Sequence, residues 1–290
     1  MKNIQLKIAI VVAVATLFSC KDEEIPVDHN TYYPSGSSTF TVSMGQAESM
    51  AHDILRTALY FACDTSLRHF AQYPIVTSTS DTSYPRTITI DFGNTDTTTL
   101  LHTPLNDMRI RNGILSITLS DDWHHTGATA TVTATSLGLS QLMTFTGVID
   151  FANRGQRSYQ SRPCYTFDFV TNNAAVEKKD GFSFKYSATK VYHLLAGDTT
   201  QTLDDDIFHI SGTASATQDT NNITLEIMGP YSISNPCFWF RSGTARITEN
   251  TIKWELMFEN STCQPLAYLL FRNNINQDDP NQMRRYIDLP

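Results

Sequence analysis

The feature that most constrains the fold of this chain is a series of short segments rich in Thr, Ile, Val and Phe, which begins at residue 86 and runs almost to the end. Clusters of Gly, Asn and Asp separate them, as turns separate strands. Several segments alternate apolar and polar residues, for example at Phe182, Phe184 and Tyr186. No crossover helices lie between them, which excludes a parallel α/β sheet. The sequence therefore predicts a mainly β protein with antiparallel sheets, arranged as a sandwich or an extended meander.

The predicted strands divide into two similar halves. They cover residues 39–44, 86–92, 113–120, 128–137 and 141–151, and then 165–170, 181–187, 190–195, 206–212, 222–229, 237–248, 251–258 and 265–271. Residues 88–95 and 254–261 share a pattern: an alternating strand, Phe, one residue, Asn, then Thr or Ser. Two related β units within the body 39–290, at about 39–160 and 161–290, would explain this echo; chance similarity of Thr-rich strands is the alternative.

One amphipathic helix is predicted near the N-terminus, over about residues 46–70. Its apolar residues follow the three-and-four spacing of one helical face: Ala47, Met50, Ala51, Ile54, Leu55, Ala58, Leu59 and Ala62. His52 and His69 lie too far apart on it to form a metal pair by helical adjacency. The helix is expected to cover one face or end of a sheet.

The first 19 residues have the parts of an export signal: a basic start with Lys2 and Lys7, then an uncharged core too short to span a bilayer. Leu17, a small residue at Ser19 and then Cys20 resemble a bacterial lipobox, in which the cysteine is acylated and becomes the first residue. An ordinary secretory peptide is the alternative. Stable anchoring needs two acyl chains or more, which a lipidated Cys20 would carry. Outer-membrane lipid is thus the first expected partner.

Residues 20–38 are read as the lipidated cysteine and a flexible tether. Lys21, Asp22 and Glu23 resemble the signal that sends Bacteroidota lipoproteins to the outer surface of the outer membrane; a polar tether without such a signal is the alternative. Cleavage before Cys20 removes two of 21 basic residues and none of 29 acidic ones, which leaves a net charge of about −10. This charge makes nucleic acid an unlikely partner.

Four cysteines follow Cys20, and an even number in an oxidising compartment suggests disulfides. Cys237 with Cys263 is the predicted pair, because it would join two neighbouring strands. Cys63 and Cys164 can form a second pair, or Cys63 can remain a buried thiol on the helix.

No motif in the sequence identifies a reaction or a cofactor, and none is predicted. Asp122, His124 and His125 could ligate a divalent metal if a turn brought them together, but a solvated hairpin turn is the favoured interpretation. Residues 204–206 are three aspartates without the remaining ligands of a calcium loop, so a polar turn is expected there.

Aromatic residues and threonines suggest two further surface features. Phe238, Trp239, Phe240 and Trp254 are expected in the core, whereas Trp123 is the candidate for an exposed recognition aromatic. Thr97 and Thr199 each follow an aspartate and precede a threonine, which resembles the acceptor motif of Bacteroidota O-glycosylation.

Several strand and turn motifs resemble those of uncharacterised β-rich lipoproteins of Bacteroidota. They are residues 88–93 (ITIDFG), 109–117 (RIRNGILSI), 126–128, 145–147, 206–212 (DIFHISG), 237–243 (CFWFRSG) and 260–263. The resemblance implies a β-rich envelope lipoprotein with a late disulfide and no assigned reaction. This chain has Asp96, Thr97 and Thr98 where the family has Cys and Gly after the first-half strand.

Two functional hypotheses remain. The first is a lipid-anchored surface protein that acts as a binding module, for instance for a glycan, or as an accessory subunit of an outer-membrane complex. The second is an envelope hydrolase acting on glycans, whose pair of acidic residues lies too far apart in sequence to be recognised. The absence of a catalytic motif favours the first.

Overall fold

A single antiparallel sheet dominates the structure. The computed structural model describes residues 37–68, 74–80, 82–93, 105, 107, 109–140, 142–198, 200, 203–234, 237, 239–259, 263–271 and 284–290. In these residues thirteen strands lie across the sheet in sequence order, each paired with its neighbours in the chain. The prediction of a mainly β, antiparallel fold is confirmed, in the form of an extended meander.

The sheet begins with β1 (Ile75–Ser78), β2 (Arg86–Asp91), β3 (Arg111–Leu119), β4 (Thr129–Leu139) and β5 (Met143–Tyr159). It continues with β6 (Arg162–Lys178), β7 (Ser183–Ala196), β8 (Ile207–Gln218) and β9 (Asn221–Ser234). The last strands are β10 (Ser242–Glu249), β11 (Ile252–Glu259), β12 (Leu266–Phe271) and β13 (Arg284–Asp288). The short β1 and β13 were not predicted.

The longest hairpin joins β5 and β6 and extends well past the predicted strands. The polar sequence at 152–164 predicts a connection, but both strands continue through it to a turn at Gln160 and Ser161. Both residues have positive φ, 49° and 65°, as a two-residue type I′ turn requires. The proposed division of the body near residue 160 falls at this turn, between two strands paired in the same sheet.

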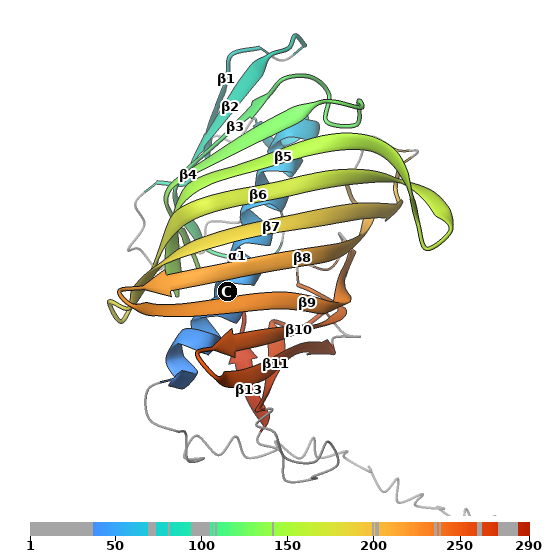
Figure 1. The fold of residues 1–290 in the computed structure, drawn as a ribbon. Coiled ribbons are helices and arrows are strands. Elements are labelled where there is room, and N and C mark those ends of the chain that lie inside the picture. The colour runs from blue at the N-terminus through green and yellow to red at the C-terminus, as the bar shows by residue number, and fades with distance from the viewer. Residues whose placement is uncertain are drawn as a thin grey trace, which may run out of the picture. The chain divides into compact units, whose positions relative to one another are not determined.

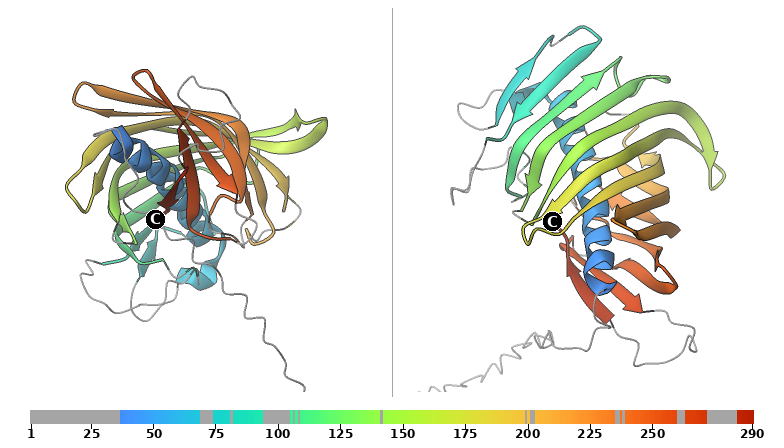
Figure 2. Two further views of the ribbon diagram at one scale, coloured as in Figure 1. Left: turned by 90° about the horizontal axis from the view of Figure 1, so that it is seen from below. Right: turned by 60° about the vertical axis from the view of Figure 1, so that its left-hand side comes forward.

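The sheet curves around the helix α1 (Ser37–Cys63), which crosses the strands on the concave side (Figures 1 and 2). Every side chain from Phe40 to Leu59 is buried. The expected helix on one side of a sheet is therefore present, and the sheet encloses it. A short 3₁₀ helix, η1 (Thr65–Arg68), follows.

Two predictions about this helix were wrong. Residues 39–44 form its first turns instead of a strand, and the α-helix ends at Cys63 instead of near residue 70. The alternation of Phe40 and Val42 with Thr41 and Ser43 resembles a half-buried strand, but all four side chains are buried here. Tertiary packing thus overrides the β preference of these residues.

The core lies between α1 and the inward-facing side chains of the strands. Along β7, for example, Phe184, Tyr186 and Tyr192 are buried, and outward-facing residues alternate with them. The pairing register continues such rows from strand to strand: Ile88 is opposite Ile117, and Ile117 is opposite Val132. Because α1 occupies the concave side, polar residues of the helix meet the inner face of the sheet.

Candidate ligand-binding site

Four charged or titratable residues of α1 face the inner side of the sheet: Glu48, His52, Asp53 and Arg56. They lie within nine residues of one another, so two and a half helical turns carry them. Charged groups buried in this way require partners, because an unpaired buried charge is strongly destabilising. The strands provide these partners.

Glu48 is bound by two residues of β7. Nζ of Lys190 lies 2.8 Å from Oε2 of Glu48, and the hydroxyl of Tyr186 donates to Oε1. The ammonium group of Lys190 also lies 5.3 Å from the centre of the Phe169 ring. This pair ties the N-terminal half of α1 to the middle of the sheet.

Asp53 is bound by arginines from the segment at the start of β3. Nη2 of Arg111 donates to both carboxylate oxygens of Asp53, at 2.8 and 3.0 Å, and Nη1 of Arg109 donates to Oδ1. Nη2 of Arg111 also donates to Oδ2 of Asp107 at 2.6 Å. Arg56 lies 3.8 Å from the same oxygen of Asp107. We call these five residues the Asp–Arg cluster.

The charges of the Asp–Arg cluster keep both carboxylates ionised. Burial alone would raise the pKa of Asp53, but the charges of nearby guanidinium groups, chiefly Arg111, outweigh it and hold that pKa well below its usual range. The pKa of Asp107 is lowered in the same way, against burial and chiefly by Arg111. The cluster therefore acts as a fixed clamp between α1 and β3.

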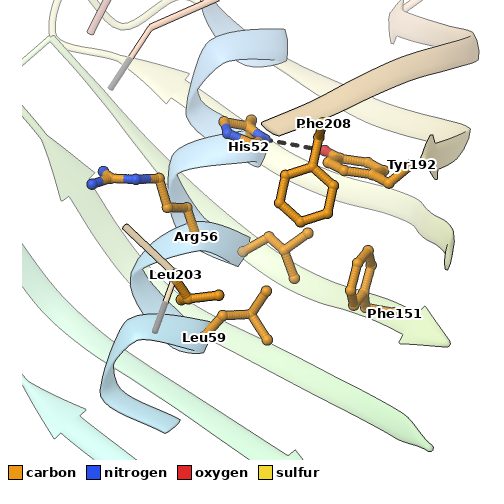
Figure 3. A pocket seen from close by; sticks show the side chains of 8 residues that line it. His52, Arg56, Leu59, Phe151, Tyr192, Leu203 and Phe208 are labelled. Carbon is orange, nitrogen blue, oxygen red and sulfur yellow. Dashed lines mark hydrogen bonds between the residues drawn. The ribbon is translucent and has the colours of Figure 1, made fainter. Parts of the chain in front are cut away.

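A pocket adjoins this cluster between α1 and the sheet (Figure 3). Its helix side consists of residues at the spacing of one helical face: His52, Leu55, Arg56 and Leu59. Phe151 on β5, Tyr192 on β7 and Phe208 on β8 form the opposite side, with Leu203 from the connection between β7 and β8. The cavity between these walls has a volume of about 20 Å³, which is room for about one water molecule. The lining is mainly hydrocarbon.

His52 is one of the polar residues of the pocket wall, with Arg56 and Tyr192. Its Nδ1 lies 3.2 Å from the hydroxyl oxygen of Tyr192, and Figure 3 shows this bond across the top of the pocket. Burial lowers the pKa of His52 to about 3, with a further contribution from the charge of Arg56. The imidazole is therefore neutral at physiological pH. Its Nε2 is buried and has no hydrogen-bond partner among the described residues.

No family model, curated protein or solved structure matches this chain. Among the helical residues that the structure describes, none belong to a helix long and apolar enough to cross a membrane.

The predicted metal candidates lie in a turn and do not converge. Nδ1 of His124 lies 2.9 Å from Oδ1 of Asp122, whereas His125 faces Asp121 at 3.2 Å. Within the described ranges no three such side chains are placed to hold a metal ion. The turn interpretation accounts for these contacts.

Trp123, the expected exposed aromatic, is buried, so that prediction was wrong. Its indole Nε1 donates to Sγ of Cys63 at 3.0 Å, and its ring packs on Phe167. A tryptophan in a polar sequence can still fold inward when the end of a helix offers an apolar surface and an acceptor. Phe240 and Trp254 are buried as predicted, Trp239 is partly buried, and Phe238 lies outside the described residues.

The four cysteines that the structure describes form one disulfide. Cys237 and Cys263 are bonded, as predicted, and their Cα atoms lie 5.3 Å apart. The alternative pairing of Cys63 with Cys164 was wrong, because both are free thiols. Cys63 ends α1 beside Trp123, whereas Cys164 lies on β6, where its Sγ is 3.9 Å from Nδ1 of His193. Each thiol therefore has its own environment.

The three aspartates at 204–206 differ in burial. Asp204 accepts a hydrogen bond from Tyr60 and Asp205 accepts one from Thr200, whereas Asp206 is buried. Neither carboxylate oxygen of Asp206 has a hydrogen-bond partner among the described residues. Burial, and after it the charges of neighbouring aspartates, raises the pKa of Asp206 to about 8.

Other predicted sites lie outside the described residues. They are the signal peptide, Cys20, the export residues Lys21, Asp22 and Glu23, the tether up to residue 36, and the glycosylation candidates Thr97 and Thr199. These assignments stay predictions.

The sequence did not reveal the residues of the pocket and the Asp–Arg cluster. Asp53 and Arg56 stand next to the apolar stripe of a helix, where polar residues usually face solvent. Their burial could have been suspected only from a sheet able to enclose the helix. No local pattern connects them with Arg111 or His52 with Tyr192, which are distant in sequence.

Proposed function

We propose that this chain is a lipoprotein anchored in the outer membrane through acylated Cys20 and directed to the cell surface by Lys21, Asp22 and Glu23. Its β-rich body is a binding module, and its candidate binding site for a small, mainly apolar molecule is the pocket between α1 and the sheet, which must widen to admit one. The observation that carries this proposal is the pocket itself, in which apolar walls surround a buried His52 whose Nε2 is unpartnered among the described residues.

Small-molecule sites are typically concave and apolar, with a few polar groups that orient the ligand, and they start at about 300 Å³. The pocket has the apolar lining of such a site, but its cavity volume of about 20 Å³ has room for only about one water molecule. The Glu48–Lys190 pair joins α1 to β7, one of the three strands of the pocket wall, and the Asp–Arg cluster joins α1 to the start of β3. Entry of a ligand therefore requires side chains of the pocket wall to rearrange, which adds to the cost of binding.

The hydrolase hypothesis has less support from the acidic residues that lie close together. Asp53 and Asp107 share the guanidinium group of Arg111, and both have lowered pKa values. A glycosidase needs a protonated carboxyl as its general acid. This pair is ionised and fully engaged in ion pairs, so it supports the position of the helix better than it supports acid catalysis.

The pocket is tested with a soluble form of the mature chain, residues 20–290 with Cys20→Ala, which needs no detergent. 1-Octanol is the probe, and isothermal titration calorimetry measures its binding. Leu203→Trp should abolish binding by filling the pocket, whereas Leu195→Trp, at an exposed leucine of β7, should not alter it. Absence of binding to the unaltered chain, or equal binding to both variants, would refute the pocket as a site.

The anchor is tested in cells. Cys20→Ala should release the full-length protein from the acylated membrane fraction and remove the mass of the acyl chains. Alanine at Lys21, Asp22 and Glu23 together should leave the protein acylated but protect it from protease added to intact cells. Unchanged membrane attachment or mass in the first case, or unchanged protease sensitivity in the second, would contradict the respective assignment.

An outer-membrane partner protein is tested by affinity purification from solubilised outer membranes followed by mass spectrometry. A stoichiometric partner would support the role of an accessory subunit. Recovery of the chain alone would count against that role and would leave the binding module as the proposal.

A further inference from the structure

The hairpin of β5 and β6 concentrates positive charge in an otherwise acidic chain. Three of the nine residues 154–162 are arginines, and none is Asp or Glu. Figure 1 shows the tip of this hairpin bending beyond the ends of the neighbouring strands. Arg154 forms an ion pair with Asp168 at 2.7 Å. The side chains of Arg157 and Arg162 are exposed and form no ion pair with the described residues, so two positive charges are available to a partner.

Both of these arginines lie on the same side of the hairpin as Tyr159. Arg162 is opposite Tyr159 in the register of the hairpin, and Tyr159 is two residues after Arg157 on β5. Residues directly opposite each other, and residues two apart in one strand, point to the same side of a sheet. One side of the hairpin therefore carries two guanidinium groups and a phenol ring.

Contacts of Tyr159 place this side over the convex face of the sheet. The ring of Tyr159 stacks on that of His193 on β7, with centres 3.9 Å apart and planes at 17°. Its hydroxyl oxygen lies 3.3 Å from Nδ1 of His209, which is opposite His193 on β8. Tyr192 and Leu194, on either side of His193 in the chain, are buried in the core, so His193 faces outward. We call five residues of this face the hairpin patch: Arg157, Tyr159, Arg162, His193 and His209.

The positive charge of the hairpin patch comes from its arginines. Burial lowers the pKa of both His193 and His209, with a further contribution to His193 from His209, so both imidazoles are neutral at pH 7. Asp204, in the connection between β7 and β8 at the same end of the sheet, accepts a hydrogen bond from Tyr60 of α1 and thus lies toward the concave side. A positive area on an acidic protein fits a partner with negative charges.

The side chains of the patch are suited to an acidic sugar chain. A guanidinium group pairs with a carboxylate, or with another oxyanion of similar geometry, through two parallel hydrogen bonds. The tyrosine and histidine rings are partly exposed, and each combines an apolar face with a polar edge. Such rings complement the C–H and hydroxyl groups of a sugar. A protein partner would usually bury an apolar centre, and the hairpin patch contains no aliphatic side chain.

The hairpin patch also lies far from the point where the tether joins the body. The helix α1 begins at Ser37, and Phe40 in its first turn packs on Phe182 and Phe184, next to the turn between β6 and β7. The tip of the hairpin is at the other end of β6, which has 17 residues. At about 3.3 Å per residue, the two ends of such a strand are about 50 Å apart. With the proposed anchor at Cys20, this separation favours a partner in the surroundings over the phospholipid of the anchoring membrane.

We propose that the hairpin patch binds an acidic polysaccharide, whose sulfate or carboxylate groups pair with Arg157 and Arg162 while a sugar ring lies against Tyr159 and His193. Tyr159 is a positioning residue, because its stacking on His193 holds the hairpin so that both arginines face one ligand. This site lies on the convex side of the sheet and is separate from the pocket beside α1.

Three eight-sugar probes test the partner class on the soluble form defined above: a heparin octasaccharide with sulfate groups, an octagalacturonate with carboxylates alone, and neutral maltooctaose. Isothermal titration calorimetry should show that an acidic chain binds at least about tenfold more tightly than maltooctaose, and the tighter of the two identifies the preferred anionic group. An increase in NaCl from about 0.05 M to about 0.3 M should weaken this binding, because salt screens exposed charges.

Variants locate the binding in the hairpin patch. Arg157→Gln with Arg162→Gln should raise the Kd of the preferred acidic chain at least about tenfold, because it removes two charge-assisted contacts. Lys185→Gln with Lys253→Gln is the matched control, since it removes the same charge at exposed positions of β7 and β11 and should leave the Kd nearly unchanged. Tyr159→Ala preserves the charge but removes the stacking contact, and it should also weaken binding. Circular dichroism verifies that each variant is folded.

Equal losses in the two double variants, or equal binding of maltooctaose and the acidic chains, would overturn the hairpin patch as an anion site. Vesicles of phosphatidylglycerol that bind more tightly than either acidic chain would overturn the choice of a polysaccharide. Unaltered affinity in Tyr159→Ala would refute its positioning role. None of these measurements involves the pocket or the lipid anchor, so this proposal can fail while the proposed function stands.

Discussion

Nζ of Lys190, on β7, lies 2.8 Å from Oε2 of Glu48, on α1, and both side chains are almost completely buried. The two residues join the helix that precedes the sheet to a strand in the middle of it. Such a pair contributes little relative to apolar residues of similar size, but loss of one partner leaves the other charge without compensation. This asymmetry makes the pair a sensitive test of the enclosed position of α1.

Glu48→Gln should lower the free energy of unfolding by about 3–5 kcal/mol, because it leaves the ammonium group of Lys190 buried without a carboxylate. Urea unfolding followed by tryptophan fluorescence measures the change. The double variant Glu48→Gln with Lys190→Met should recover part of this loss. Asp168→Asn is the control: it breaks an exposed pair with Arg154 and should cost less than about 1 kcal/mol. Equal losses at the two sites would contradict the burial of the Glu48 pair.

Asp206→Asn should stabilise the protein at pH 9, by about 1–3 kcal/mol, because it replaces a buried carboxylate whose oxygens lack partners among the described residues. The raised pKa of Asp206, about 8, determines whether stability rises or falls with pH. A carboxyl whose pKa rises on folding contributes stability below its unfolded pKa, about 3.9, and that stability is lost as pH rises through 8. Urea unfolding between pH 5 and pH 9 should therefore show a flatter profile for the variant. Asp219→Asn, at an exposed turn, should leave the profile unaltered.

Replacement of Cys237 and Cys263 by serine should lower the free energy of unfolding by about 2–4 kcal/mol. The disulfide closes a loop between residues 26 positions apart, which includes the hairpin of β10 and β11, and its removal enlarges the unfolded ensemble. Urea unfolding under oxidising conditions compares the two proteins. Reduction of the unaltered chain should reproduce this loss of stability. A serine variant as stable as the oxidised parent would show that the disulfide does not restrict the unfolded ensemble.

Cys63 and Cys164 should react slowly with a thiol reagent at pH 8 in the folded protein and rapidly after unfolding in urea. Burial raises the pKa of Cys63 to about 12 and also raises that of Cys164, so little thiolate is present. The soluble form with Cys20→Ala contains no other free thiol, so unfolding without a reductant should release two. Release of none would mean that these cysteines are bonded to each other after all.

The strand positions were largely predictable because the sheet has one inner face. Phe184 and Tyr186 on β7, or Ile223 and Leu225 on β9, alternate with outward-facing residues, and this period is visible in the sequence. The start of α1 was not predictable from the same rule. Thr41 has a β preference, but in the structure it is helical and its hydroxyl donates a buried hydrogen bond to Glu249, which is distant in the chain.

The candidate site was less accessible to sequence reasoning than the fold. Strand alternation predicts that Tyr192 faces inward, but not that it meets His52. The partners of Asp53 come from a segment whose arginines resemble an exposed polar stretch before a strand. Long-range pairs of this kind depend on the curvature of the sheet around α1, and no local sequence signal encodes that curvature.

The enclosed helix also constrains the order in which the chain can assemble. Each strand of the meander pairs with its sequence neighbours, so hairpins can form successively as the chain emerges N-terminus first. The helix emerges before any of them. Its residues Asp53 and Glu48 can form their ion pairs only after Arg111 and Lys190, which come later in the chain, have been added. Until β7 is available, α1 is an amphipathic segment with unmatched charges and an exposed apolar stripe. During this interval the helix is the segment whose exposed apolar stripe makes the incomplete chain most prone to aggregation.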